Sequence, residues 1–177
     1  MILAIDPGNE QSAWVLYDEQ NKMPIEFAKE PNDVVLERVR TLREQADEIA
    51  IEMIASYGMG VGQTVFDTCV WIGRYYQLWE ELGGQVTQVF RKDVKLHLCG
   101  VTRAKDSNVR QAIIDRYGSD KKIAIGNKKS PGPLYGIKAD IWAALGVAIT
   151  YCEVDPEKNK KATKLTVDTI KGLLKGE

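Results

Sequence analysis

Residues 2–18 read ILAIDPGNEQSAWVLYD, two apolar runs joined by a turn that contains Pro7 and Gly8. Apolar residues on both sides of such a turn predict the two antiparallel strands of a hairpin. A further apolar run at 24–30 follows the turn-like sequence NKMP and adds a third strand. This meander commits the beginning of the chain to a sheet, so the remaining segments must extend that sheet or pack against it.

Beyond the meander, helical and strand-like segments alternate. Apolar residues three and four apart predict helices, and short apolar runs bounded by turn residues predict strands. The expected elements are helices at 32–47, 63–82, 104–117 and 139–152, strands at 49–55 and 85–90, a helical turn at 91–98 and a loop at 118–137. This order predicts an α/β fold with a five-stranded mixed sheet flanked by helices. We expect one domain over residues 1–152, followed by a tail at 153–177 that forms a short helix.

The distribution of charge indicates a class of partner. The chain has 177 residues, 44% of them hydrophobic, which is enough to fill the core of one domain. Its net charge is only −1, yet residues 91–138 contain twelve Lys and Arg against four Asp. A basic segment of this kind indicates a polyanion such as a nucleic acid.

Several other classes of protein are disfavoured. The three cysteines show no spacing typical of zinc sites or disulfide frameworks, so we expect reduced thiols and a cytoplasmic protein. No apolar run approaches the ~20 residues that cross a bilayer, so we expect no membrane partner. The glycine-rich YGMGVGQT at 57–64 lacks the GK[ST] of a P-loop and the order of a dinucleotide fingerprint, so we expect no nucleotide cofactor.

Three acidic residues lie in apolar surroundings that do not suit a charge. Asp6 ends the first strand, Glu52 lies within IAIEMIA, and Asp140 lies near the start of the last helix, in KADIWAALGVAIT. Each alone has a structural explanation, as a turn former, a residue on the exposed side of an edge strand, or an acid at a helix N-terminus. Together, on strands expected to be central and a helix packed across them, they would repel one another without a cation. Oxygen ligands without His or Cys suit Mg²⁺ or Mn²⁺, and paired ions of this kind serve phosphodiester hydrolysis.

The ordered set of segments resembles the RuvC group of Holliday-junction resolvases, within the ribonuclease-H-like superfamily. ILAIDPG is similar to that group's opening strand and turn, AIEM to its second acidic strand, and KADIWAALGVAIT to its closing acidic helix. Between them, FRKDVKLHLCGVTRAKDSNVRQAI is similar to the stretch that carries the group's basic residues. The resemblance covers about residues 1–152 and implies a ribonuclease-H-like fold.

The resemblance also implies roles for particular residues. Asp6, Glu52 and Asp140 match the group's metal-binding acids, which would hold two Mg²⁺ or Mn²⁺ ions per active site. Lys105 matches a lysine that contacts the scissile phosphate, so it joins these acids as a catalytic residue. The expected DNA-binding residues are Tyr57, Arg91, Lys92, Lys95, Arg103, Lys105, Arg110, Lys128, Lys129 and Lys138. One position departs from the group: Ala143 stands where a further acid is usual.

These observations favour a Mg²⁺-dependent crossover junction endodeoxyribonuclease from a bacterial or phage-infected cell. Paired nicks on a two-fold symmetric junction call for two equivalent active sites, so we expect a homodimer. In the resembled group the long helix serves the dimer, so Trp71, Tyr75 and Leu78 on one face of 63–82 are candidates for core or interface. Two alternatives remain: a nuclease for branched DNA in general or for RNA processing, and, because of Ala143, a junction-binding protein with weakened catalysis.

Overall fold

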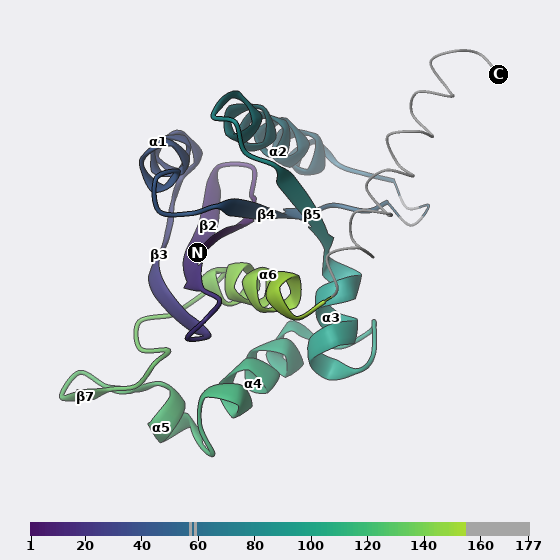
Figure 1. Cartoon of the computed structure of the whole chain (residues 1–177). Helices are drawn as coiled ribbons and strands as arrows, with labels where there is room; N and C mark the ends of the chain where they lie inside the picture. Colours follow the sequence, from purple (N-terminus) through teal and green to yellow (C-terminus); the bar gives the residue numbers. More distant parts are fainter. Residues whose placement is uncertain (57, 59, 155–177) are drawn as a thin grey trace, which may run out of the picture.

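The structure is a computed structural model that describes residues 1–56, 58 and 60–154 (Figure 1). Its elements are β1 Ile2–Asp6, β2 Gln11–Asp18, β3 Met23–Pro31, α1 Asn32–Leu42, β4 Glu48–Met53, α2 Gln63–Glu81, β5 Val86–Phe90, α3 Arg91–Cys99, α4 Asp106–Tyr117, α5 Lys121–Ala124, β6 Gly126–Asn127, β7 Ser130–Pro131 and α6 Ile141–Glu153. The predicted α/β fold with a five-stranded mixed sheet flanked by helices is confirmed. No helix in the described part of the chain is long and apolar enough to span a bilayer.

The principal sheet has the strand order β3-β2-β1-β4-β5. β1 pairs antiparallel with β2 and parallel with β4, so the meander and the βα units meet at β1. β4 also pairs with β5, which excludes the explanation that Glu52 lies on an edge strand. Ile5 is opposite Ile51, so Asp6 and Glu52 occupy the same end of two neighbouring central strands.

Helices cover both faces of this sheet (Figure 1). α6, with α3 and α4 outside it, packs on one face, and α1 and α2 pack on the other. Successive side chains of a strand point to opposite faces, so Ala4 faces α6 whereas Leu3 and Ile5 face α1 and α2. The same alternation directs Asp6 and Glu52 to the α6 face, because they share the parity of Ala4 and Ala50.

α6 is apolar around its whole circumference because it lies between the sheet and the outer helices. Its residues from Ile141 to Thr150 are all buried. A helix that is hydrophobic all round is typical of such a central position. The strands below it present small side chains at Ala4, Ala13 and Ala50, which let the helix approach the end of the sheet that bears the acids.

Three boundaries differ from the sequence prediction. α6 begins at Ile141, so Asp140 precedes the helix instead of lying one turn inside it. Ala139 takes the left-handed conformation at φ 46°, which turns the chain into α6. The expected loop at 118–137 contains the short helix α5, whose N-cap Asp120 accepts hydrogen bonds from two backbone N–H groups, and the β6–β7 hairpin. α1 ends at Leu42, before the expected 47. The predicted helix in the tail lies outside the described residues.

A buried polar network holds the turn that follows Asp6. Asn32 donates from Nδ2 to the carbonyl of Gly8 at 2.9 Å and accepts from Ser12 Oγ at 2.6 Å. Tyr75 of α2 donates to the same pair, which ties the turn to both helices of that face. A Cβ on Gly8 would lie 2.3 Å from the Gln11 carbonyl, so glycine is required there. This network sets the position from which Asp6 enters the site.

Replacing Asn32 should therefore destabilise the fold. Asn32→Ala leaves the Gly8 carbonyl and the Ser12 hydroxyl buried without their partner, at an expected cost of about 2–3 kcal/mol in the free energy of unfolding. Urea denaturation of the two proteins measures this difference. Asn21→Ala is the matched control, because Asn21 is exposed and bonds only Asp18; an equal loss in both variants would contradict the role of the network.

Candidate metal centre and nucleic-acid interface

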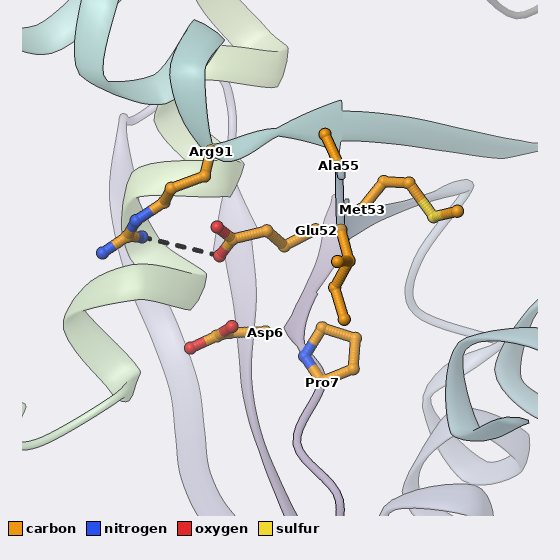
Figure 2. Close-up of a pocket in the computed structure, with 7 residues that line it drawn as sticks. Asp6, Pro7, Glu52, Met53, Ala55 and Arg91 are labelled. Carbon is orange, nitrogen blue, oxygen red and sulfur yellow. Dashed lines mark hydrogen bonds and ion pairs between the residues drawn. The ribbon is translucent and has the colours of Figure 1, made fainter. Parts of the chain in front are cut away.

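Asp6 and Glu52 line one cavity at the end of the sheet (Figure 2). The cavity measures about 260 Å³. Its other lining residues are Pro7, Met53, Ile54, Ala55 and Arg91. The Glu52 side chain is only 12% exposed. Both carboxyl groups extend to the side of the sheet on which Arg91 lies, as the parity of the strands requires.

Burial and the neighbouring Glu52 disfavour the ionisation of Asp6, whereas the hydrogen bond with Asp6 favours the ionised form of Glu52. Burial raises the pKa of Asp6 to about 8, and the charge of Glu52 and a hydrogen bond with it act in the same direction. Burial also raises the pKa of Glu52, although the positive charge of Arg91 opposes this. Two acids in such a position require either a proton or a cation to compensate their charge. The pair can therefore hold either a proton or a cation.

Arg91 is the basic residue closest to this pair. It is the first residue of α3 and follows β5 directly, which brings its side chain over the end of β4. Its Nη1 lies 3.5 Å from Glu52 Oε2, and its Nη2 lies 2.8 Å from Oδ1 of Asp106, the first residue of α4. Lys95 Nζ lies 3.5 Å from the same Asp106 oxygen. The guanidinium therefore joins an acid of the sheet to an acid of the outer helices.

Asp140 lies in a neighbouring cavity of about 310 Å³, which Arg91, Asp106 and Ala143 also line. Its carboxylate pairs with Lys29 of β3 at 2.6 Å. It is close enough to Asp6 for its charge to raise the pKa of that residue further. Ala143, one turn into α6, contributes only a methyl group to this cavity.

The donor set fits one divalent cation at the Asp6–Glu52 pair. In the parts of the chain that the structure describes, no group of three or more His, Cys, Asp or Glu side chains lies close enough to bind one metal ion together. Of the three predicted metal-binding acids, two are thus brought together. The third, Asp140, lies beside them with Lys29 as its partner.

The predicted DNA-binding residues occupy several elements around the acids. Arg110 stacks on Trp142 at 5.0 Å and lines the Asp140 cavity. Arg103 and Lys105 line a separate hollow of about 530 Å³ beside α4, so the contact of Lys105 with a scissile phosphate stays a prediction. Lys92 lies over the ring of Phe90. Lys128 and Lys129 of the hairpin and Lys138, two residues before Asp140, are exposed. Tyr57 lies outside the described residues.

The sequence prediction omitted two charged residues that the fold brings to the acids. Lys29 contacts Asp140 across 111 positions of sequence, and no local pattern marks such a pair. Asp106 is the first residue of a helix, and acidic residues are common there because they interact favourably with the helix dipole. Its type and position therefore did not by themselves suggest a role in the site. Its position next to the basic Lys105 and at the start of a predicted helix was the only available signal. Both residues change the charge balance of the site.

Comparison with known proteins gives a consistent answer for the fold. No protein-family model matches the sequence, and no curated protein matches it. Among solved structures, Thermus thermophilus RuvC is similar with a TM-score of 0.57 and 18% identity, over 85% of this chain and 92% of that chain. T. thermophilus RuvC in complex with a Holliday junction substrate is similar with a TM-score of 0.59 and 17% identity, over 85% and 91%. The chain therefore has the ribonuclease-H-like α/β fold of RuvC, which confirms the resemblance at the level of the fold.

Proposed function

We propose that the protein is a divalent-metal-dependent endonuclease that resolves four-way DNA junctions by paired symmetric nicks. The observation that carries this proposal is the largely buried Asp6–Glu52 pair in one cavity, and the raised pKa values of the two carboxyls support a site for a cation there. It stands on a fold also found in a RuvC structure that holds a Holliday junction substrate. The reaction is that of a crossover junction endodeoxyribonuclease.

The proposed reaction is phosphodiester hydrolysis. The oxygen of a water molecule forms a bond to phosphorus, the bond from phosphorus to one ester oxygen breaks, and that oxygen takes up a proton. Mg²⁺ or Mn²⁺, when bound, supplies an activated water and compensates the charge that develops on the phosphate. Asp6 and Glu52 would hold the ion, because their carboxylates are directed into one cavity from two hydrogen-bonded strands. Arg91 places a further positive charge beside them.

Positive side chains on several other elements would hold the DNA backbone. Those with exposed positions come from α3, α4, the β6–β7 hairpin and the residues before α6: Lys92, Arg103, Lys105, Arg110, Lys128, Lys129 and Lys138. Contacts of this kind supply most of the affinity for nucleic acid and weaken steeply as salt increases. They read no sequence, so junction recognition would come from the shape of the DNA and the spacing of two active sites.

We propose that α2 forms the homodimer interface through its outer face. Trp71, Tyr75 and Leu78 pack on the protein's own core, so that face of the helix serves the fold. The opposite face exposes Phe66 at 54% and Val70 at 61%. Two large apolar side chains one turn apart on a solvent-facing helix are suited to packing against the same helix of a second copy.

A charge on this face should therefore separate the subunits. Val70→Glu would bury an unpaired carboxylate in the interface, and we expect dimer dissociation to become at least about 100-fold more favourable, equivalent to about 3 kcal/mol. Sedimentation equilibrium measures the change. Val34→Glu is the control, because Val34 is 39% exposed and belongs to a different helix, α1. An unchanged association constant for Val70→Glu would contradict this interface.

A cleavage assay tests the proposed function. Purified protein is incubated with labelled four-way junctions, Y-forks and linear duplexes in Mg²⁺ and, separately, in Mn²⁺. Symmetric nicks in the junction alone support resolution. Forks cut as fast as junctions would show a nuclease of broader selectivity. Tight junction binding without cleavage in either metal would instead show a junction-binding protein. Ala143 and the ion pairs of the acids would then explain the lack of cleavage.

A further inference from the structure

The guanidinium of Arg91 lies where the two acidic cavities meet. It lines the cavity of Asp6 and Glu52 and also that of Asp140 and Ala143. Its ion pairs, at 3.5 Å to Glu52 and 2.8 Å to Asp106, direct its positive charge into this junction. Its side chain is 29% exposed, so much of that charge is held away from solvent. Figure 2 shows the guanidinium beside the Glu52 carboxylate, on the same side as Asp6.

We propose that Arg91 supplies the second positive charge of the active site, so that each site holds one divalent cation instead of two. This inference rests on the proposed function, because the cation concerned is the one that hydrolysis would use. It replaces the two-ion site that the sequence led us to expect. Three properties of the site support it: the balance of charge, the chemistry of the second cavity, and the chemistry of guanidinium.

The balance of charge leaves room for one divalent ion. Four carboxylates lie at this end of the molecule: Asp6, Glu52, Asp106 and Asp140. The last three form ion pairs with three basic side chains, Lys29, Arg91 and Lys95. With all of these groups ionised, the cluster carries a single excess negative charge. One divalent cation changes the net charge of the cluster from −1 to +1. Two divalent cations would leave a net charge of +3 in a partly buried site. Such an excess is unfavourable where water screens charge poorly.

The second cavity is a poor site for an ion. Ala143 presents a methyl group there, and Asp140 is already paired with Lys29. Asp106 is paired with both Arg91 and Lys95. An ion placed there would stand next to the guanidinium and be repelled by it. The Asp6 side of the site is different, because Asp6 and Glu52 share one cavity there and no basic side chain of the described residues forms an ion pair with Asp6.

Guanidinium can do at a phosphate part of what a second ion does. Its planar group donates two parallel hydrogen bonds to phosphate oxygens, and it never loses its charge near neutral pH. The Asp106 side chain is 72% exposed, so its bond to Nη2 is open to exchange. A DNA phosphate entering from solvent can replace Asp106 on Nη2 while Nη1 stays next to Glu52. Arg91 would then act on the DNA and complete the charge of the site.

The number of bound Mn²⁺ ions tests this inference directly. Free Mn²⁺ is followed by electron paramagnetic resonance while the ion is titrated into the whole protein. We expect one ion per chain in the wild type and in Arg91→Lys, which keeps the charge. We expect two in Arg91→Met/Ala143→Asp, which removes the charge and adds a carboxylate. Arg40→Met is the control, because the exposed Arg40 of α1 forms its ion pair within the described residues with the neighbouring Glu37.

Two ions per wild-type chain, or none, would overturn the inference, and so would one ion in the double variant that retains the wild-type circular dichroism. The wild-type count decides the question even if that variant does not fold. Junction cleavage is measured on the same samples, which separates the two proposals. One bound ion without nicking would retain the inference and reject the proposed function. Two bound ions with symmetric nicking would do the opposite.

Discussion

Asp6→Asn is expected to reduce nicking of a four-way junction by at least about 10³-fold. The substitution keeps the shape of the side chain and removes the charge that holds the cation. An ion of this kind contributes several kcal/mol to the stabilisation of the transition state, and each ~1.4 kcal/mol corresponds to a factor of ten in rate. The rate of appearance of paired nicks in labelled junctions, measured at saturating protein, gives the size of the effect.

The matched control is Asp33→Asn. Asp33 is an exposed acid on the first turn of α1, on the opposite side of the sheet from α6, and among the described residues its carboxylate accepts a hydrogen bond from the adjacent backbone N–H alone. We expect normal nicking from this variant. Gel-shift measurements without divalent ions should show that Asp6→Asn still binds the junction, because the basic side chains that hold phosphates are unchanged. Nicking by Asp6→Asn at the rate of the wild type would reject Asp6 as a ligand.

The second large effect concerns the pH dependence of stability in the metal-free protein. Folding raises the pKa of Asp6 to about 8, mainly through burial and then through the charge of Glu52. The carboxyl of the unfolded chain has its ordinary pKa near ~4. The folded state therefore binds a proton that the unfolded state has released, and it is favoured at low pH. This contribution is fully present below the unfolded pKa and is lost as pH rises through the folded pKa.

The wild type should accordingly lose stability relative to Asp6→Asn between about pH 4 and about pH 8. The slope for one such group is at most about 1.4 kcal/mol per pH unit. Urea denaturation in the presence of a chelator, at several pH values, measures the difference between the two proteins. Other acids whose pKa values are lowered, such as Asp106, contribute to both proteins and cancel in the difference.

Divalent cation provides the second half of this experiment. Mn²⁺ should restore the stability of the wild type above neutral pH, because it binds the folded state and compensates the two carboxylates. It should have much less effect on Asp6→Asn. Two outcomes together would contradict this prediction: parallel curves of stability against pH for the two proteins in chelator, and equal responses of the two proteins to Mn²⁺. They would show that ionisation of Asp6 does not destabilise the fold.

Much of the fold follows from short patterns in the sequence. The Pro7–Gly8 turn predicted the hairpin, and the apolar run around Glu52 predicted a central strand, which its pairing with β1 and β5 confirms. Alternation along a strand is a local property, and together with the observed register of β1 and β4 it places Asp6 and Glu52 on the same face. The boundaries were less certain: Asp140 lies before α6 and not inside it, because the turn at Ala139 is set by a left-handed backbone conformation.

The partners of the acids could not be obtained in the same way. Arg91 was expected to contact DNA, and the structure places it against Glu52 and Asp106. Lys29 had no predicted role and pairs with Asp140. Neither pair has a local signature, because ion pairs between distant segments depend on how the layers are stacked. Their effect is to alter which acids are free to hold a cation.

The sequence by itself determined the order of the five principal strands and the longer helices and the identities of the three unusual acids, because hydrophobic periodicity and turn chemistry act over a few residues. The tertiary structure alone decided which of those acids meet. It set Asp6 against Glu52 through the pairing of β1 with β4, turned Asp140 to Lys29, and placed a guanidinium between the two cavities. Charge interactions depend on distance in space and on burial, so the cation capacity of the site is a property of the packed molecule.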